Sequence, residues 1–234
     1  MSRTLRPSDI AQQLGISTSS LRNYEARGIV PPADRAPNGY RVYTHEHVAY
    51  FECIVAMSPG FGMEITSAVL SMLQQRELGA VLWLINDAQA ATHEDKLVLD
   101  KADNLLEQMA ADQGGKVSWM SIGELSAAVN IPASTLRYWE HEELICSMRN
   151  EKNNYRLYDK FQEVKIWLLK STQKAVYSEE TVRLKQAIGN VSPGDWQALR
   201  SLIESARNAL HQRNREQLHG LHSLYRLCTV LNLS

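Results

Sequence analysis

Residues 5–43 read LRPSDIAQQLGISTSSLRNYEARGIVPPADRAPNGYRVY, and residues 120–158 read MSIGELSAAVNIPASTLRYWEHEELICSMRNEKNNYRLY. The two stretches align without a gap at an offset of 115 residues. The paired identities are Ile16/Ile131, Ser19/Ser134, Leu21/Leu136, Arg22/Arg137, Glu25/Glu140, Asn38/Asn153, Tyr40/Tyr155, Arg41/Arg156 and Tyr43/Tyr158. A repeat has to be recognised before a fold is assigned. Two copies, each followed by a long unrepeated segment, indicate a duplicated domain rather than a solenoid.

Each copy has the spacing of a helix-turn-helix. In the first copy Ser8 and Asp9 offer capping side chains, and apolar residues then recur at helical spacing. Gly15 allows the chain to turn sharply, and Ser17 is placed to cap a second helix. In the second copy Asn130 stands in place of the glycine. We therefore predict two helices joined by a tight turn in each copy.

A polar stretch after the second helix leads to a predicted hairpin. Residues 38–43 read Asn-Gly-Tyr-Arg-Val-Tyr, and residues 153–158 read Asn-Asn-Tyr-Arg-Leu-Tyr. Asn-Gly before alternating apolar and polar residues is a strong hairpin signal. A helix-turn-helix followed by a hairpin is a winged helix, in which the second helix suits the major groove and the wing suits the adjacent phosphates.

These motifs resemble the MerR (mercury-resistance regulator) family of bacterial transcription factors. The family carries Leu-Arg-Tyr-Tyr-Glu at the recognition helix, then Gly-Leu-Ile/Val, then Asn-Gly-Tyr-Arg-x-Tyr at the wing. The first copy has Leu-Arg-Asn-Tyr-Glu at 21–25 and Gly-Ile-Val at 28–30, and the second has Leu-Arg-Tyr-Trp-Glu at 136–140 and Glu-Leu-Ile at 143–145. The resemblance implies a further helix pair in each module. Thr44 and Asp159 would cap the first helices, and the steps to the second helices would fall at 60–63 and 177–180.

The predicted fold is mainly α, with two winged helix-turn-helix modules, each with a small β-hairpin wing, joined and followed by long amphipathic helices. The predicted segments are 1–76 (first module), 77–116 (acidic connector helix and linker), 117–190 (second, partly divergent module) and 191–234 (C-terminal amphipathic helical segment). A MerR-type protein normally carries one module per chain, so the tandem arrangement departs from the family.

Charge distinguishes the two copies within a chain whose net charge is −1. Residues 3–43 contain six arginines and three acidic residues, which gives +3. Residues 120–158 contain four basic and five acidic residues, which gives −1. Since neutralisation of phosphates dominates affinity for DNA, the first copy is predicted to bind DNA more strongly.

The two connecting segments carry opposite charge. Residues 87–112 hold seven acids and two lysines (−5), and residues 195–226 hold five arginines and three acids (+2). Both have apolar residues at helical spacing, so we predict that they lie against each other, with charge selecting partner and direction. Leu221, Leu224, Cys228 and Leu231 extend the second stripe beyond what one module can cover. We therefore favour pairing with a second chain over pairing within one chain; packing of each helix on its own module is the remaining alternative.

The resemblance also implies a DNA contact face. Its predicted residues are Thr18, Ser19, Arg22, Asn23, Tyr24, Arg35, Tyr40 and Arg41 in the first copy, and Arg137, Tyr138, Trp139, Arg149, Tyr155 and Arg156 in the second. Arg22 and Arg137 would contact phosphate or a base edge, and Arg41 and Arg156 would bind phosphate. Tyr24 and Trp139 would either anchor a phosphate or serve the core.

Other chemistry is not predicted. Cys53, Cys146 and Cys228 are far apart in the sequence and form no ligand pair. His219 and His222 are three residues apart but belong to no recognisable metal-ligand motif, so no metal or cofactor is expected. No nucleophile and base occur in a catalytic arrangement, so an enzyme is not predicted. The amino terminus has no signal-peptide core, and we expect a cytoplasmic, nucleoid-associated protein with no membrane partner.

Two functions fit the sequence. The first is a transcription regulator that binds double-stranded promoter DNA as a homodimer, with RNA polymerase and a small-molecule effector as further partners. The second is a protein that binds or sequesters a small molecule such as a drug, with Trp83, Trp119, Trp167 and Trp196 lining an apolar pocket. The arginines at both wings favour DNA.

Overall fold

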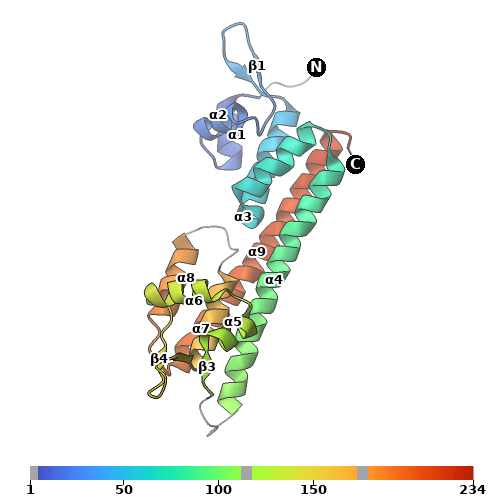
Figure 1. Ribbon diagram of the computed structural model, residues 1–234. Coiled ribbons are helices and arrows are strands. Elements are labelled where there is room, and N and C mark those ends of the chain that lie inside the picture. Colours follow the sequence, from blue (N-terminus) through green and yellow to red (C-terminus); the bar gives the residue numbers. More distant parts are fainter. Residues whose placement is uncertain (1–4, 112–117, 173–178, 234) are drawn as a thin grey trace. The chain divides into compact units, whose positions relative to one another are not determined.

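The computed structural model describes residues 5–111, 118–172 and 179–233, and their fold is mainly α, as predicted (Figure 1). In chain order the elements are α1 (Pro7–Leu14), α2 (Thr18–Ala26), β1 (Asp34–Arg35), β2 (Arg41–Val42), α3 (His45–Gln74), α4 (Leu78–Ala111), β3 (Met120–Ser121), α5 (Ile122–Val129), α6 (Ala133–His141), β4 (Met148–Arg149), β5 (Arg156–Tyr158), α7 (Lys160–Ser171), α8 (Glu179–Gly189) and α9 (Trp196–Val230). They form two compact units. Unit 1 is Met1–Ala90 with His211–Ser234, and unit 2 is Ala91–Leu210.

The first helix-turn-helix forms largely as its sequence predicts. Gly15 ends α1 in the left-handed conformation, with φ 65°. The side chain of Ser17 accepts a hydrogen bond from the backbone N–H three residues further on and so caps α2. The capping prediction for Ser8 and Asp9 is wrong, because α1 begins at a proline and its N-cap is Arg6, whose side chain makes no capping bond. Proline suits the first helical turn because that turn needs no backbone donor.

Strand pairing in the two wings shows that the two copies do not align without a gap. In the first wing Arg35 pairs with Arg41 across the strands. In the second, Arg149 pairs with Arg156, although an offset of 115 residues would place Asn150 there. The second copy is therefore one residue shorter before its wing and one residue longer in the wing loop. Pairing geometry, unlike residue identity, reveals these compensating changes.

The third strand of the second wing has a counterpart in the first. Met120 in β3 pairs with Tyr158 in β5. In the first copy Leu5 and Tyr43 form a single antiparallel bridge at the same place. Each wing is thus tied to the stretch that precedes its first helix.

The predicted second helix pair of the first module appears as α3. Thr44 caps it, and Gly62 interrupts the helical dihedrals with φ 77° and ψ 162°. This break falls at the predicted step between two helices. In the second module Asp159 caps α7, whereas the predicted step at 177–180 begins outside the described residues. The linker predicted at the end of segment 77–116 also lies mostly outside them.

By length and composition α3 is apolar enough to cross a membrane, with a mean hydropathy of 1.4 over its most apolar window. Half of that window is buried inside the protein, however, and a buried core helix of a globular domain has the same composition. The helix also contains the break at Gly62, and its inner residues belong to the core of unit 1.

The core of unit 1 is closed by a segment from the far end of the chain. Leu224, Leu227 and Cys228 of α9 are buried together with residues of α1, α2, α3 and the first part of α4. The backbones of α3 and α9 approach closely. A Cβ added at Gly60 would lie 2.5 Å from the backbone nitrogen of Gln217. Only glycine leaves room for this approach.

The core of unit 2 is built in the same way from α5, α6, α7 and parts of both connectors. Leu99, Ala102 and Leu106 of α4 are buried with Leu199 and Ile203 of α9. Other α4 residues of this unit also contact the module, since the ammonium group of Lys101 lies 4.8 Å from the ring centre of Trp167 in α7.

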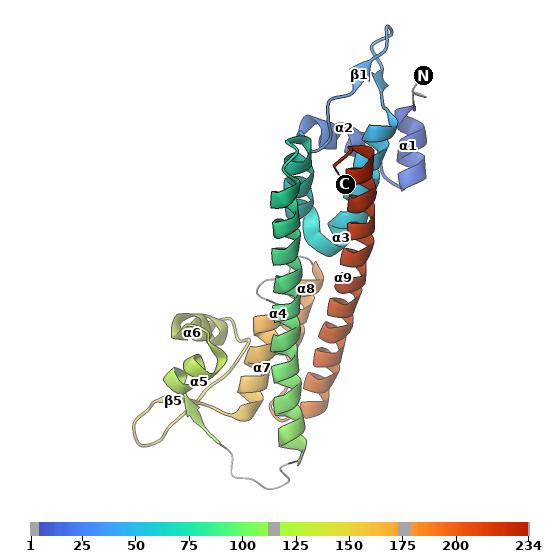
Figure 2. The same cartoon turned by 90° about the vertical axis from the view of Figure 1, so that its right-hand side faces the viewer.

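The predicted pairing of acidic and basic connectors is confirmed. Within each unit part of α4 lies beside part of α9 (Figure 2), and in unit 2 the guanidinium of Arg207 binds the carboxylate of Asp103. The prediction that the apolar stripe of α9 extends beyond what its own chain can cover is wrong. Leu224 and Cys228 are buried in unit 1, and Leu221 and Leu231 pack against the same core. The stripe is therefore covered by residues of its own chain.

Candidate nucleic-acid interface

The recognition helices hold their polar faces outward because buried leucines fix the opposite face. In α2, Leu21 is fully buried, while Ser19, Arg22 and Asn23 are exposed and Thr18 is half-buried. In α6, Leu136 is fully buried. Each helix thus presents short polar side chains and an arginine to solvent, a set suited to base edges and phosphates.

The second recognition helix differs from the first in its aromatic residues. Tyr138 is 58% exposed, and Arg137 beside it is also exposed. Trp139 is only 6% exposed and belongs to the core of unit 2. The ring of Trp139 therefore serves the core, which was one of its two expected roles. Tyr24, its counterpart, is half-buried and packs against the core of unit 1.

The tip of the first wing is held by side-chain bonds to its own backbone. The amide of Asn38 accepts a hydrogen bond from the backbone N–H of Tyr40 at 3.2 Å, an Asx turn. The guanidinium of Arg35 donates to the carbonyl of Gly39 at 3.1 Å. The phenol ring of Tyr40 stands out from this ordered tip and is 72% exposed.

The second wing repeats the arrangement with different backbone residues. Asn153 accepts from the N–H of Tyr155 at 3.1 Å, and Arg149 donates to the carbonyl of Asn154 at 3.0 Å. Tyr155 is 67% exposed. Each wing thus presents an exposed tyrosine beside an arginine that also braces the turn.

Arg41, predicted to bind phosphate, has a partner within its own module. Its Nε donates to Oε2 of Glu25 at 2.7 Å, and the hydroxyl of Tyr43 donates to the same oxygen at 3.4 Å. The side chain of Glu25 is only 13% exposed. Burial, and next the nearby Glu25 carboxylate, raise the pKa of Tyr43 to about 12, so the phenol is a hydrogen-bond donor at neutral pH.

The same three-residue contact occurs in the second module. Nε of Arg156 donates to Oε2 of Glu140 at 2.8 Å, and the hydroxyl of Tyr158 lies 3.5 Å from it. The hydroxyl of Ser147 donates to the other oxygen of Glu140. Burial and Glu140 raise the pKa of Tyr158 to about 12. We call each set of glutamate, arginine and tyrosine the helix–wing cluster.

Sequence reasoning missed the glutamate and the tyrosine of these clusters. In the sequence, Glu25 and Glu140 contribute only to the net charge of their copies. The signal was present in the repeat, because Glu25, Arg41 and Tyr43 all recur at the same offset. An acid that recurs together with an arginine and a tyrosine indicates an internal contact.

The described residues contain no group of three or more histidine, cysteine or acidic side chains placed to hold a metal ion. Cys53 and Cys228, distant in sequence, both enter the core of unit 1. Burial, followed by the effect of Cys228, raises the pKa of Cys53 to about 12. This thiol is protonated at neutral pH and has little nucleophilic character.

The tryptophans proposed to line a ligand pocket have different surroundings. Trp83 is 71% exposed on α4 in unit 1, while Trp167 is buried in the core of unit 2 and Trp196 packs edge-on against Phe161.

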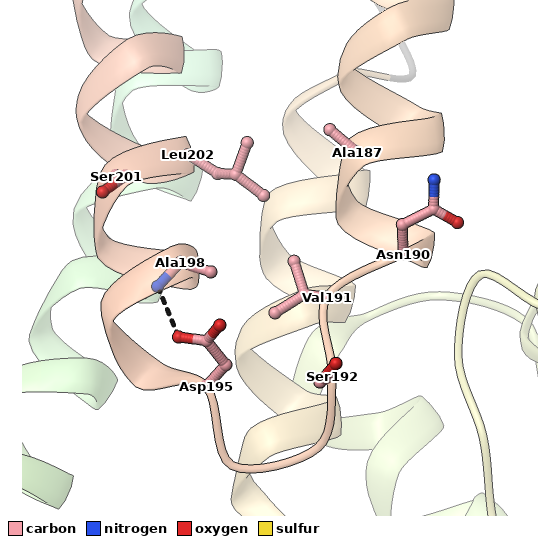
Figure 3. Close-up of a pocket in the computed structure, with 8 residues that line it drawn as sticks. All are labelled: Ala187, Asn190, Val191, Ser192, Asp195, Ala198, Ser201 and Leu202. Atoms are coloured by element: carbon pink, nitrogen blue, oxygen red, sulfur yellow. Dashed lines mark hydrogen bonds between the residues drawn. The ribbon is translucent and has the colours of Figure 1, made fainter.

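A pocket of about 400 Å³ between α8 and α9 is lined by Ala187, Asn190, Val191, Ser192, Asp195, Ala198, Ser201 and Leu202. Figure 3 shows that its acidic side chain, Asp195, is occupied as the cap of α9. None of the lining residues is buried.

Comparisons with known proteins agree with this geometry. Residues 6–43 match the family described as MerR family regulatory protein, and residues 120–184 match the MerR HTH family regulatory protein. The HTH-type transcriptional regulator CueR of Escherichia coli O6:H1 is 34% identical over 83 residues, 35% of this chain and 53% of that protein. CueR of Salmonella typhimurium is 27% identical over 119 residues, 50% of this chain and 78% of that protein.

The HTH-type transcriptional regulator AdhR of Bacillus subtilis is 38% identical over 48 residues, 20% of this chain and 34% of that protein. The chain thus spans about half the length of the first curated relatives it matches. No solved structure matches it. The predicted resemblance to MerR-type regulators is confirmed, since each of the two copies matches a MerR family model.

Proposed function

We propose that this chain of two MerR-type modules is a sequence-specific regulator of transcription that binds double-stranded promoter DNA. The observation that carries the proposal is the exposed face of each module, where a recognition helix and a wing both present arginine. The recognition helices α2 and α6 would enter the major groove, and the wings would follow phosphates. The relatives named above are transcriptional regulators, which supports a non-enzymatic role in the cytoplasm, at the nucleoid.

The two modules contribute unequally in this proposal. The first contains an excess of three positive charges and the second an excess of one negative charge over the compared stretches. Phosphate contacts supply most of the affinity. The first module would therefore supply most of the binding energy, and the second would add length and register to the site.

Homodimerisation stays a prediction. The apolar stripes of α4 and α9 are covered within each unit by residues of the same chain, so a second chain is not needed to bury them. One chain already supplies two recognition helices, the number that a dimer of single-module proteins supplies. The solution mass at micromolar concentration distinguishes a chain that acts alone from one that pairs.

The family resemblance further implies that the bound promoter is distorted, which realigns its elements for RNA polymerase when an effector binds. Bending or untwisting a short site costs on the order of a few kcal/mol, which additional contacts can recover. A duplex labelled with fluorophores at both ends would report such a bend as a change in energy transfer.

A salt titration tests the main proposal. Binding to duplex DNA should weaken linearly in a plot of log affinity against log salt, with a slope of about −0.9 for each phosphate neutralised. The variant Arg22→Ala/Arg137→Ala, whose changes lie on exposed faces, is the matched control and should show a shallower slope. A folded wild-type protein that binds no duplex at low salt would refute the proposal and favour the small-molecule function.

A further inference from the structure

The helix–wing clusters join two elements that must meet DNA at different places. Glu25 lies near the end of α2, while Arg41 and Tyr43 belong to the wing strand and its end, 16 and 18 residues later. A single carboxylate oxygen, Oε2 of Glu25, accepts hydrogen bonds from both Arg41 and Tyr43. The contact therefore fixes the distance between the recognition helix and the wing.

The contact is shielded enough from water to hold its geometry. The side chains of Arg41 and Glu25 are 27% and 13% exposed, and those of Arg156 and Glu140 are 35% and 21% exposed. Exposed ion pairs contribute little, whereas hydrogen bonds between charged groups in partly buried places are among the stronger ones. The tyrosine rings beneath them, Tyr43 and Tyr158, are fully buried.

We propose that Glu25 and Glu140 are positioning residues that set the wing at a fixed place relative to the recognition helix, and thereby determine sequence specificity rather than general affinity for DNA. This inference rests on the proposed function. Arg41 and Arg156 act through the same contact: their Nε atoms brace the wing, so these arginines are part of its frame. Base readout needs the helix in one register, and the wing secures that register by its phosphate contacts.

The two clusters differ in strength. Glu140 receives a further bond from Ser147, whereas the corresponding stretch of the first module, residues 31–33, reads Pro-Pro-Ala and offers no hydroxyl. The first cluster therefore depends more heavily on Arg41 and Tyr43, and its glutamate is the better one to change.

A purely electrostatic role for Glu25 predicts the opposite result. An acid near phosphates repels them, so its removal would strengthen binding to every duplex. A positioning role predicts that its removal weakens binding to the preferred sequence while binding to unrelated sequence is unchanged or stronger. The sign of the change on preferred DNA separates the two roles.

The experiment compares Glu25→Ala with Glu25→Gln in the full chain. Both variants remove the same charge, but only glutamine keeps an oxygen that can accept from Arg41 and Tyr43. The two probes are a duplex selected by the wild-type protein from a random library and a mixed-sequence duplex. Glu25→Ala should lose about ten- to a hundredfold in affinity for the selected duplex, the range expected for a charge-assisted bond. Glu25→Gln should recover most of that loss, and neither variant should weaken binding to the mixed duplex.

Three results would overturn the inference. Equal gains of Glu25→Ala and Glu25→Gln on both duplexes would show a charge effect alone. Equal losses on both duplexes, with a lower melting temperature, would show a general folding defect. A selected duplex bound by Glu25→Ala as tightly as by the wild type would show that specificity does not depend on this residue.

A measurement without DNA separates failure of the inference from failure of the proposed function. A double-mutant cycle of Glu25→Ala and Arg41→Ala, followed by denaturant unfolding of the full chain at neutral pH, should show that the two changes are coupled, because the Arg41 guanidinium donates to the Glu25 carboxylate. A control cycle of Glu25→Ala with Arg156→Ala should show no coupling. Additive effects of Glu25→Ala and Arg41→Ala would refute the contact itself, whereas a wild-type protein with the contact but no affinity for any duplex would refute only the regulator proposal.

Discussion

The two modules reach the same backbone with different residues at three left-handed positions. The first module has glycine at all three: Gly15, Gly28 and Gly39 have φ of 65°, 69° and 80°. The second has Asn130, Glu143 and Asn154, with φ of 49°, 58° and 58°. Asparagine tolerates this conformation, whereas glutamate pays a steric cost of about 1–2 kcal/mol. Tertiary packing therefore imposes the turn even where the local residue disfavours it.

The second module compensates with better capping. Its first helix starts with a capping box in which Ser121 and Glu124 bond to each other's backbone N–H groups, while the first module starts α1 at Arg6 without a side-chain cap. A capping side chain contributes about 1 kcal/mol. The two modules therefore hold the same frame by different local means, and the charge of the compared stretches, +3 against −1, also distinguishes them.

Unit 1 also depends on a contact made by the end of the chain. The break at Gly62 leaves the carbonyl groups of the preceding turn without their helical donors. Gln217 and Arg213 of α9 donate to the carbonyl of Gly60 at 3.2 and 3.3 Å. A helix from the far end of the chain thereby completes a helix end within unit 1. The matching step of the second module, residues 177–180, begins outside the described residues.

The largest expected difference between the units appears at alkaline pH. In unit 1 burial raises the pKa of Tyr43, Tyr50 and Cys53 to about 12 in each case. A folded-state pKa above the unfolded value gives stability that is complete below the unfolded value, about 9–10 here, and is lost as pH rises through about 12. Unit 1 should therefore unfold as pH rises from 10 to 12.

Unit 2 should resist the same change better. Of its described groups Tyr158 has a raised pKa of about 12, whereas burial lowers the pKa of Lys165, which makes stability rise with pH until the unfolded lysine has lost its proton. As pH rises, the helical signal in circular dichroism should begin to fall because unit 1 unfolds. The fluorescence emission of Trp139 and Trp167, which lie in the core of unit 2, should change only at higher pH. A single transition at one pH in both signals would contradict this difference.

The next effect concerns the close packing of α3 and α9. Gly60→Ala should lower the free energy of unfolding of unit 1 by about 2–3 kcal/mol, the upper part of the range for overpacking, because its Cβ would meet backbone atoms at 2.5–2.9 Å. Gly123→Ala in α5 is the control, since its Cβ would meet nothing nearer than 4.0 Å. Denaturant unfolding with hydrogen exchange of each unit measures both. Equal stability of the two variants would mean that α9 is not tightly docked on α3.

A smaller effect separates the recognition helices. Arg22→Ala should cost about 1–2 kcal/mol of binding free energy, the worth of a charge-assisted contact. Arg137→Ala should cost less, because its module has a net charge of −1. Titrations on one duplex at one salt concentration compare them. A loss for Arg137→Ala as large as that for Arg22→Ala would show that module charge does not rank the two faces.

The smallest effect tests the strained turn. Glu143→Gly should stabilise unit 2 by about 0.5–1 kcal/mol, the steric cost of the left-handed conformation less the extra entropy of glycine. Gly28→Ala is the reciprocal change and should destabilise unit 1 by a similar amount, since the space around its Cβ is open and only the backbone conformation opposes it. Thermal melting of both variants gives the result. Destabilisation by Glu143→Gly would show that the side chain makes a contact worth more than the strain.

Local sequence was enough to predict the recurring frame of this protein. The caps at Ser17, Thr44 and Asp159 and the turns at Gly15 and Asn130 were predicted correctly, because each depends on residues within one helical turn. The interruption near residue 62 was predicted from the family resemblance and is also encoded locally by glycine. The exposed positions of Ser19, Arg22 and Asn23 on α2 agree with the contact face that the family resemblance implies.

Only the tertiary structure decided which partner each long-range group selects. From the sequence, phosphate is the expected partner of Arg41. In the folded chain its Nε lies 2.7 Å from Oε2 of Glu25. The apolar stripe at Leu224 and Cys228 has no sequence mark that tells its own chain from a second one, and the fold places it in the core of unit 1. The one-residue shift between the wings became visible only through strand pairing. Periodicity and caps are properties of neighbouring residues, whereas a choice among several chemically equivalent partners depends on distances that exist only once the chain has folded.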